Sequence, residues 1–594
     1  MNYLRLTILT LLLICSSTWA NPQDEKIAAV ESGLLPANVF KGDQPWTLQE
    51  RMQHYGVPGV GIAVIHDSKV AWFKTYGLAD RETGEATKNS TLFQAGSVSK
   101  PVAAFAALQM VEGGELSLDG DVNSSLKSWK LPKNEFTADA MVTLKQLLSH
   151  TGGLTVHGFR GYAVGEEVPD TIQVLDGSGP ANSAPVRVNK TPGEGYRYSG
   201  GGYTIAQLMM ADASGKPFEV LMNELLIKPA NMTQSTFQQP LPSALLKLAA
   251  AGVLPDGTAV KGKRHTYPEM AAAGLWTTAG DLALFAIEMQ SALNGESKLM
   301  SKDMAQIMTT PVDAGYGLGW GIRKVGSSGY FSHGGWDEGF CTQLTAHLEG
   351  GYGVVVMINS NHPAFLNEVV NAVGHTYGWD GYEANDILPV PEKMLKAYAG
   401  RYHYNAAIPV VVTSKQGKLF LNYPGAEAVE LVYTGDDLFK RRTRATPIKF
   451  IRDENTIQFS FVLGDGEHQS HRKLADDEHL PGEILDFGTY EDALTAFRKA
   501  LKNSPDEETL SENYLNGYAL NSLTDSPVFS TRLLQINTDL YPGSANTWDS
   551  LAYAYQQAGD KEKAIEHYRN ALKRDPKFAS ALAALAELEA TKKD

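Results

Sequence analysis

The stretch that decides the fold is a tight turn followed by an apolar helix, and it reads Phe93-Gln94-Ala95-Gly96-Ser97-Val98-Ser99-Lys100-Pro101. Glycine adopts backbone conformations that other residues avoid, so Gly96 permits a turn just before Ser97. Proline is accommodated in the first turn of a helix, because its missing N–H has no partner to lose there. The following residues, 102–111, are apolar almost all round, which predicts a buried helix.

Ser97 and Lys100 are three residues apart and therefore lie side by side on the predicted helix. A serine hydroxyl is a poor nucleophile until a base takes its proton, and a lysine in a dry site has a pKa low enough to act as that base. The helix N-terminus also favours negative charge that develops at the serine. The pair is a candidate catalytic centre, and the competing interpretation is a capping serine followed by a solvated lysine.

The composition is that of a large acidic globular protein. Its 594 residues predict three or four domains, and its net charge of −15 argues against nucleic acid or an anionic membrane as the main partner. Cys341 is expected to be a small buried hydrophobe. The histidines show no metal-ligand spacing and no nucleotide-binding glycine motif follows a strand, so we predict neither a metal nor a cofactor.

Residues 1–20 read as a secretory leader. Arg5 supplies the positive start, Leu6–Cys15 is an apolar run too short to span a bilayer, and Thr18-Trp19-Ala20 resembles a cleavage site. A signal anchor is the alternative. We therefore expect an exported, periplasmic protein whose mature chain has no transmembrane span.

Strand-like runs near both ends of the first domain predict an antiparallel sheet. The two expected hairpins are 60–65 with 70–76 and 340–348 with 352–359. A mostly helical insert, about 97–299, lies between them. This arrangement favours an α+β domain over residues 21–388 rather than a doubly wound fold.

Two later stretches carry candidate site residues. Tyr198 stands in a glycine-rich segment that can approach a site closely, and a protonated lysine nearby would favour its phenolate form. His333 precedes two glycines at a strand, which leaves an open backbone edge for a substrate or an oxyanion. The competing interpretations are a core tyrosine and a surface histidine in a hairpin. His150 ends a helix capped by Thr143, and we expect its ring to bond a carbonyl rather than to act as a base.

In this order, the motifs between residues 48 and 361 resemble the serine β-lactamase-like superfamily, in particular class C β-lactamases, D-Ala-D-Ala carboxypeptidases, D-aminopeptidases and esterases. The stretches that carry the resemblance are Ser97-Val98-Ser99-Lys100, Leu147-Leu148-Ser149-His150-Thr151-Gly152-Gly153-Leu154, Tyr198-Ser199-Gly200, Ala273-Gly274-Leu275-Trp276-Thr277-Thr278-Ala279-Gly280-Asp281-Leu282 and His333-Gly334-Gly335. The resemblance implies that Ser97 is acylated and that Lys100 and Tyr198 share proton transfer.

The resemblance also implies roles along the His333 strand. His333 would hold a substrate carboxylate or relay protons, and the backbone N–H groups of Ser97 and Trp336 would form an oxyanion hole. Gly334 and Gly335 would lie at the same substrate-binding edge.

Two departures from the family pattern affect the expected substrate. Gly200 replaces an asparagine that contacts the substrate's amide side chain in β-lactamases, and His333 replaces the lysine of class C enzymes. We therefore rank the amide bonds of D-configured peptides first, esters second and β-lactams third. A non-catalytic binder of peptidoglycan fragments and an adaptor protein are the alternatives from other classes.

The rest of the chain predicts two appended modules. After a proline-rich linker, short alternating runs predict a small antiparallel barrel over residues 392–476, whose opening Tyr398-Ala399-Gly400-Arg401-Tyr402 resembles lipocalin-like domains. Residues 485–594 resemble tetratricopeptide repeats, with prolines 34 residues apart at 542 and 576 and about three copies. Their concave face is expected to hold a peptide or protein partner, or else to dock onto the barrel.

Overall fold

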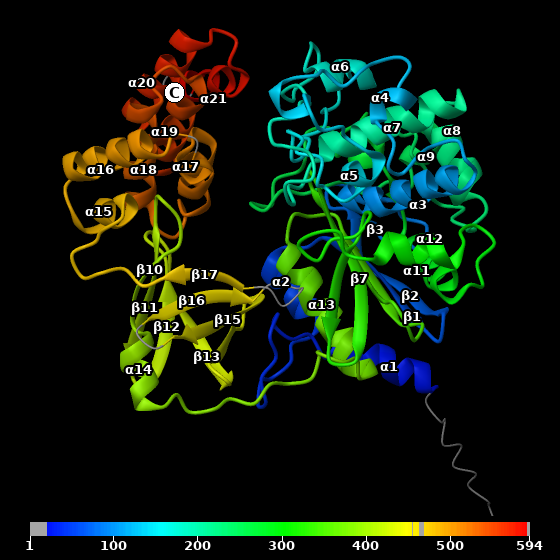
Figure 1. The fold of residues 1–594 in the computed structure, drawn as a ribbon, viewed down its shortest axis with the longest axis horizontal. Helices are drawn as coiled ribbons and strands as arrows, with labels where there is room; N and C mark the ends of the chain where they lie inside the picture. Colours follow the sequence, from blue (N-terminus) through cyan, green and yellow to red (C-terminus); the bar gives the residue numbers. More distant parts are fainter. Residues whose placement is uncertain (1–20, 454–455, 463–467, 506, 591–594) are drawn as a thin grey trace, which may run out of the picture. The chain divides into compact units, whose positions relative to one another are not determined.

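The computed structural model describes residues 21–453, 456–462, 468–505 and 507–590, so the predicted leader lies outside the described residues. The chain divides into two compact units (Figure 1). The first comprises Met1–Pro36 with Asp43–Glu383, and the second comprises Ala37–Gly42 with Ala384–Asp594.

The first unit is built on a seven-stranded antiparallel sheet with the order β3-β2-β1-β9-β8-β7-β6. The strands are β1 (Gly59–His66), β2 (Lys69–Asp80), β3 (Glu85–Ala86), β6 (Gly321–Val325), β7 (Ser328–Asp337), β8 (Phe340–His347) and β9 (Gly353–Ile358). Both predicted hairpins are confirmed, because β1 pairs with β2 and β8 pairs with β9. β1 also pairs with β9, so strands from the two ends of the domain meet at the centre of the sheet.

Both faces of this sheet are buried. In β9, Val354 and Val356 pack in one hydrophobic cluster, while Val355 and Met357 belong to another on the opposite face. The first cluster includes residues from α1 (Pro22–Glu31), α2 (Leu48–Tyr55) and α13 (Pro363–Tyr377). Because side chains alternate between faces, a strand that is covered on both sides reads as continuously apolar.

The second face is covered by the predicted helical insert, which the structure confirms (Figure 1). Its helices are α3 (Ser99–Glu112), α4 (Val122–Ser125), η2 (Glu135–Thr137), α5 (Leu144–Leu148), α6 (Thr171–Asp176), α7 (Gly200–Ser214), α8 (Phe218–Met222), η3 (Asn223–Ile227), α9 (Ser243–Leu246), α10 (Met270–Ala273), α11 (Ala279–Asn294) and α12 (Lys302–Thr309).

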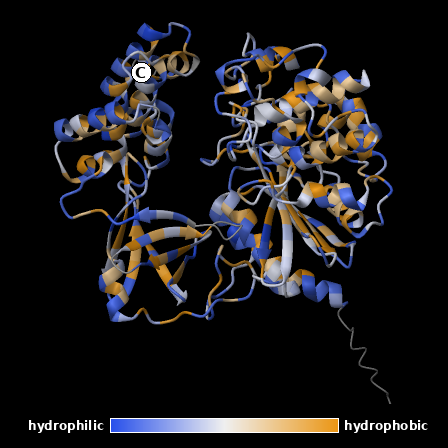
Figure 2. Ribbon diagram, viewed as in Figure 1, coloured by the Kyte–Doolittle hydropathy of each residue, from blue (hydrophilic) through white to orange (hydrophobic). Residues whose placement is uncertain are grey.

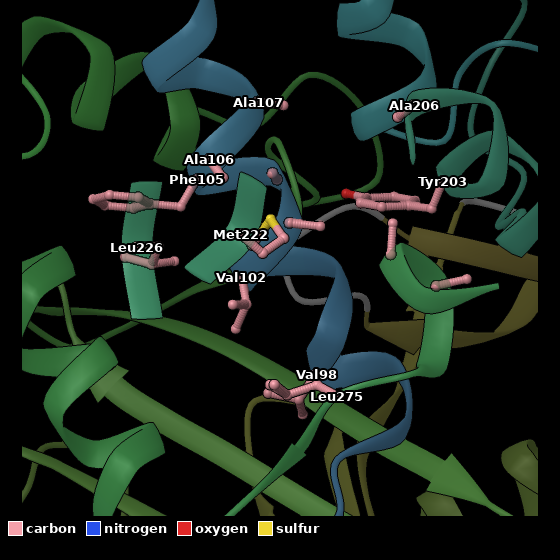
Figure 3. Close-up of a cluster of buried hydrophobic side chains, with 14 of the residues drawn as sticks. Val98, Val102, Phe105, Ala106, Ala107, Tyr203, Ala206, Met222, Leu226 and Leu275 are labelled. Atoms are coloured by element: carbon pink, nitrogen blue, oxygen red, sulfur yellow. The ribbon is translucent and has the colours of Figure 1, made fainter. Parts of the chain in front are cut away.

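Helix α3 lies at the centre of the insert, as its apolar sequence predicts. Eleven of its 14 residues are buried, so neighbours pack on every side of it. Figure 3 shows Val102 and Phe105 of α3 among side chains from other segments, including Tyr203, Met222 and Leu226. Orange, hydrophobic ribbon runs along α3 in Figure 2. This packing fixes the helix on which the candidate nucleophile is mounted.

The second unit begins with the predicted barrel. Eight antiparallel strands follow one another in the order β10 to β17, and a bridge between Tyr402 and Lys473 nearly closes the sheet. The barrel comprises α14 (Glu392–Tyr398), β10 (Gly400–His403), β11 (Pro409–Lys415), β12 (Lys418–Asn422), β13 (Val429–Gly435), β14 (Leu438–Arg441), β15 (Arg444–Arg452), β16 (Ile457–Val462) and β17 (His468–Arg472). The alternating runs in the sequence, 410–413, 418–423, 430–433, 448–451 and 456–462, predicted β11, β12, β13, β15 and β16. They did not predict β10, β14 and β17.

A helical array completes this unit and packs on the barrel. Its helices are α15 (Pro481–Phe487), α16 (Tyr490–Asn503), η4 (Glu508–Leu510), α17 (Glu512–Asn521), α18 (Pro527–Leu540), α19 (Ala545–Gln557), α20 (Lys561–Arg574) and α21 (Ala579–Ala590). Ile408 of the barrel shares a buried cluster with Leu485 and Phe497, and the Tyr518 hydroxyl donates a hydrogen bond to the Pro424 carbonyl at 2.6 Å. In the described part of the chain, no helix combines the length and apolar character of a membrane span.

Candidate active site

Ser97 lies in a single 3-10 turn, η1 (Gly96–Val98), that leads directly into α3. Gly96 has a φ of +53°, in the left-handed region that favours glycine. A Cβ at this position would also lie 2.5 Å from the Trp336 nitrogen. The glycine before the candidate nucleophile is therefore required for two reasons: its backbone conformation and the strand beside it.

The turn Gly96–Val98 carries the candidate nucleophile Ser97, and we call it the nucleophile turn. A neighbouring segment of the insert stabilises it. The Ser99 hydroxyl donates to the Gly96 carbonyl at 2.6 Å and accepts the Leu275 N–H at 3.0 Å. Just before the turn, β4 (Phe93–Gln94) pairs with β5 (Trp276–Thr277). The stretch around Leu275, one of those that carry the family resemblance, thus helps to hold the turn with Ser97 in place.

The structure brings Ser97 and Lys100 together. Lys100 Nζ lies 2.9 Å from Ser97 Oγ and donates to the Ala272 carbonyl at 2.8 Å. Burial lowers the pKa of Lys100 from 10.5 to about 7, although the nearby Asp337 carboxyl partly opposes this shift. Near neutral pH a large fraction of the amine is therefore uncharged, and its lone pair can accept the serine proton.

Tyr198 completes this group from the loop before α7. Its hydroxyl is hydrogen-bonded to Ser97, and Lys100 Nζ lies 4.9 Å from the centre of its ring. Burial raises the pKa of Tyr198 far above 10, and the serine bond offsets only part of that rise. The sequence argument that a lysine would favour the phenolate is outweighed by burial, so this tyrosine keeps its proton at neutral pH.

His333 lies on β7 with its ring centroid 6.3 Å from that of Tyr198. Its Nδ1 is 2.6 Å from the Gly334 carbonyl, which can only accept, so Nδ1 carries the proton. Its Nε2 therefore accepts from the Tyr316 hydroxyl, 3.0 Å away. Burial and the nearby Lys100 lower the pKa of His333 to about 3, so at neutral pH the ring supplies no positive charge for a substrate carboxylate.

The strand that carries His333 also meets the nucleophile turn. β6 pairs with β7 only as far as Ser332, so residues 333–337 pair with β8 alone and leave the other edge free of a strand. A Cβ at Gly335 would lie 1.9 Å from the Ala95 carbonyl oxygen, whereas the nearest atom to one at Gly334 would be the Gln343 side-chain oxygen at 3.3 Å. The Trp336 side chain is half-exposed, and its backbone nitrogen lies against Gly96.

The structure adds three aromatic side chains to the candidate site. Sequence reasoning had not assigned them to it. His150 packs against Tyr198 with ring centroids 4.1 Å apart and the planes tilted by 35°. His157 lies 4.9 Å from the same ring, and the Tyr316 hydroxyl is hydrogen-bonded to His333. His150 accepts the Ser199 N–H instead of bonding a carbonyl, and it has a φ of +60°. That strained backbone is the kind of feature found at functional sites, but it is invisible in the sequence.

Two carboxyl groups are buried near the candidate site, Asp337 close to Lys100 and Glu269 close to Asp337. Asp337 and Glu269 are almost fully inaccessible, and burial raises the pKa of Glu269 to about 8 and that of Asp337 well above 3.8. Cys341 is buried and unpaired as expected, and burial raises its pKa to about 12, so it is not a thiolate. In the described ranges, no cluster of three or more His, Cys, Asp or Glu side chains has the arrangement of a metal site.

The β-lactamase family model matches residues 47–375, more than half of the chain. The chain belongs to the β-lactamase family. A tetratricopeptide repeat model matches residues 545–588.

Relatives with curated names fit this assignment. Esterase EstB of Burkholderia gladioli is 30% identical over 190 residues, which are 30% of this chain and 47% of the esterase. A penicillin-binding protein of Bacillus subtilis (strain 168) is 21% identical over 71% of this chain and 96% of its own length.

Two solved structures are also similar. They are the octameric penicillin-binding protein homologue from Pyrococcus abyssi, which covers 71% of this chain and 97% of its own, and the D-alanine carboxypeptidase AmpC from Burkholderia cenocepacia, which covers 60% and 99%. Each has 22% sequence identity and a TM-score of 0.47.

Proposed function

We propose that this chain is a serine hydrolase that cleaves amide or ester bonds through an acyl-Ser97 intermediate. One observation carries the proposal: a buried lysine amine, with its pKa lowered to about 7, lies 2.9 Å from the Ser97 hydroxyl. Such an amine is poised to take the serine proton at neutral pH.

Acylation begins when Ser97 Oγ attacks the substrate carbonyl and its proton passes to the uncharged Lys100 amine. Negative charge develops on the carbonyl oxygen, and we assign its stabilisation to the backbone N–H groups of Ser97 and Trp336. The close approach of Trp336 to Gly96 supports this assignment, because it places both nitrogens beside one turn.

Tyr198 is assigned to the leaving group. Because its pKa is raised by burial and its hydroxyl bonds Ser97, it is a protonated donor beside the bond that breaks. Lys100 then replaces the proton that Tyr198 gives up. In the second half of the cycle a water attacks the acyl-serine along the same proton route, and Ser97 is regenerated.

Three substrate classes follow from the family and its named relatives. We keep the amide bonds of D-configured peptides as the first class, on the family resemblance of the five motifs. Esters are the second class, and the 30% identity to an enzyme named as an esterase favours them specifically. β-Lactams rank third, because Gly200 and His333 depart from the β-lactamase pattern.

A panel on the purified chain separates these classes. We expect p-nitrophenyl esters or D-aminoacyl p-nitroanilides to be turned over at least ten times faster than nitrocefin, as judged by kcat/KM. Rapid nitrocefin hydrolysis with no ester or amide turnover would reverse the ranking.

The main rival is a non-catalytic binder of peptidoglycan fragments. A fluorescent fluorophosphonate reacts covalently with an activated serine, so we expect it to label the wild-type chain and not the Ser97→Ala variant. A wild-type chain that neither labels nor turns over any substrate would favour the binder.

The repeats are proposed to add a protein-binding function. The repeat match and a groove of about 850 Å³ in the helical array, lined among others by Val528, Arg532 and Tyr553, support this. Removing residues after Leu485 is expected to abolish partner capture. We further propose that the protein is exported to the periplasm, and N-terminal sequencing of the mature chain tests this by placing its start near Asn21.

A further inference from the structure

A short loop lies beside Tyr198 and has no role in the proton transfers described above. It comprises His157, Gly158, Phe159 and Arg160, and we name it the acyl wall. His157 and Arg160 are exposed, Phe159 is partly exposed, and the His157 ring contacts Tyr198 with a centroid distance of 4.9 Å. The loop therefore reaches the candidate active site at the residue that bonds the nucleophile.

The acyl wall is anchored at both of its ends. At one end, the Gly200 N–H donates to the His157 carbonyl at 3.0 Å, beside the N-terminus of α7. At the other end, His265 Nδ1 donates to the Arg160 carbonyl at 2.8 Å. The neighbouring Tyr267 hydroxyl accepts the Glu338 N–H at 2.9 Å, which links this end to the tip of β7. The loop thus bridges the Tyr198 segment and the end of the His333 strand.

Phe159 occupies the space that a side chain at position 200 would enter. A Cβ placed on Gly200 would lie 3.0 Å from Phe159 Cε2 and 3.2 Å from the His157 carbonyl oxygen. The Phe159 ring can therefore take this position only because residue 200 has no side chain. The surface offered here is an aromatic ring, which cannot replace the hydrogen bonds that a polar acyl group gives up to water.

The rings around Tyr198 are uncharged as well. His150, His157 and His333 all lie near its ring, and burial together with the nearby Lys100 lowers the pKa of each of them. At neutral pH these imidazoles are neutral. Bringing a carboxylate against neutral rings removes its water without supplying an opposite charge, which is strongly unfavourable.

We infer that the acyl wall selects substrates whose acyl group is uncharged and apolar, with the Phe159 ring as the main specificity contact. This inference rests on the proposed acyl-Ser97 hydrolase. If it holds, it favours simple aliphatic or aromatic acyl groups and so places esters of such acids ahead of the D-configured peptides ranked first above. Arg160 is the one charged member of the wall, so it is the residue through which a carboxylate would be recognised if the inference is wrong.

A matched pair of esters with the same leaving group tests the selectivity. p-Nitrophenyl hexanoate and mono-p-nitrophenyl adipate have acyl chains of equal length, and only the second ends in a carboxylate. We expect kcat/KM of the full chain to be at least ~10-fold higher for the hexanoate. Equal or faster turnover of the adipate, abolished by Arg160→Ala, would overturn the inference and make the wall a carboxylate-binding loop.

Substitutions then assign the effect to Phe159. Phe159→Ala is expected to lower kcat/KM for the hexanoate by ~10- to 200-fold and to change that for p-nitrophenyl acetate by less than ~3-fold, because an acetyl group is too short to use the ring. Phe159→Leu, which keeps an apolar side chain, is expected to retain most of the hexanoate activity even if the alanine variant folds poorly. Val164→Ala, at an exposed position of the same segment, is the control and should leave both esters unaffected.

The acetate also separates this inference from the proposed function. If Ser97 is labelled and the acetate is hydrolysed while Phe159→Ala treats hexanoate as the wild type does, the hydrolase stands and the role of the acyl wall is wrong. If the wild type hydrolyses neither ester and Ser97 does not label, the proposed function itself fails.

Discussion

At the scale of single residues, the amine of Lys100 is the group on which the proposed chemistry depends. Its ordinary pKa of 10.5 would leave it protonated and unable to accept the Ser97 proton, but burial lowers that pKa to about 7. Tyr198 responds to the same burial in the opposite sense and keeps its proton. One dry site therefore holds an uncharged amine and a protonated phenol at neutral pH, as the proposed roles of base and acid require.

This arrangement predicts the pH dependence of the reaction. Because the uncharged amine is the active form, kcat/KM is expected to rise with pH, reach half its plateau near pH 7 and stay level above it. Measuring kcat/KM for an uncharged ester between pH 5 and 9 tests this rise with pH. The arginine of Lys100→Arg stays protonated throughout this range, so the variant is expected to have a kcat/KM at least ~1,000-fold lower than the wild type. A wild-type kcat/KM that does not depend on pH would contradict the role of Lys100.

Glu269 predicts a pH effect on stability rather than on chemistry. Burial raises its pKa from 4.5 to about 8. The neutral carboxyl therefore allows the protein to fold, whereas ionisation of the carboxyl opposes folding. Its stabilising contribution is complete below about pH 4.5 and is lost as the pH rises to about 8, which amounts to about 3 kcal/mol by pH 7.

Glu269→Gln keeps the shape of the neutral carboxyl but cannot ionise, so the variant does not lose stability as the pH rises. The variant is therefore expected to melt a few degrees higher than the wild type at pH 7 and at nearly the same temperature at pH 4.5, as measured by differential scanning fluorimetry. The exposed Glu115→Gln is the control and should change neither value. A melting temperature of the Glu269 variant that falls at pH 7 would show that the carboxylate is paired in the folded state.

At the scale of elements, the junction between β7 and the nucleophile turn holds the site together. The strand approaches so closely that only glycine fits at position 335, where a Cβ would lie 1.9 Å from the Ala95 carbonyl oxygen. At the neighbouring Gly334 a Cβ would lie 3.3 Å from the side-chain oxygen of Gln343, so a shift of a few tenths of an ångström in that side chain is enough to accept a methyl group. Two adjacent glycines in one strand therefore have different requirements.

We expect Gly335→Ala to move β7 away from Ser97 and to lower kcat/KM by at least ~100-fold, with a lower melting temperature. Gly334→Ala serves as the matched control and is expected to keep the wild-type melting temperature. Similar effects of the two substitutions would show that the strand and the turn are not in contact in solution.

Sequence reasoning succeeded for elements with a strong local signal. The hairpins, the buried α3 and the order of the modules follow from periodicity and glycine placement, and the structure confirms them. It failed for β10, β14 and β17, which are too short to show a clear alternating pattern. It also failed where a residue reaches the site only through the tertiary fold, because His157 and Tyr316 lie in loops that fold back onto Tyr198 and His333. His150 was noticed in the sequence, but its contact with Tyr198 depends on a positive φ that no pattern reveals.

At the scale of the whole molecule, the second unit joins the barrel and the first repeat helices through one hydrophobic cluster. Ala407 and Ile408 of the barrel are buried with side chains of α15 and α16, and Tyr518 bonds the barrel backbone. These contacts predict that the barrel and the adjacent helices lose their structure together.

Ile408→Ala removes buried methyl groups from this cluster and is expected to cost about 2–4 kcal/mol. Hydrogen exchange should then accelerate in both the barrel peptides around 409–422 and the helical peptides around 481–503. Val528→Ala, at an exposed position of α18, is the control and should change neither. Acceleration confined to the barrel would mean that the repeats are stable by themselves.

The central claim is that Ser97 becomes acylated with Lys100 as its base, and mass spectrometry of the chain quenched during ester turnover tests it most directly. We predict an acyl adduct on the peptide that contains Ser97, formed in the wild type, absent from Ser97→Ala, and formed at least ~1,000-fold more slowly in Lys100→Ala. Undiminished turnover in Ser97→Ala, or an adduct on another residue, would contradict the claim.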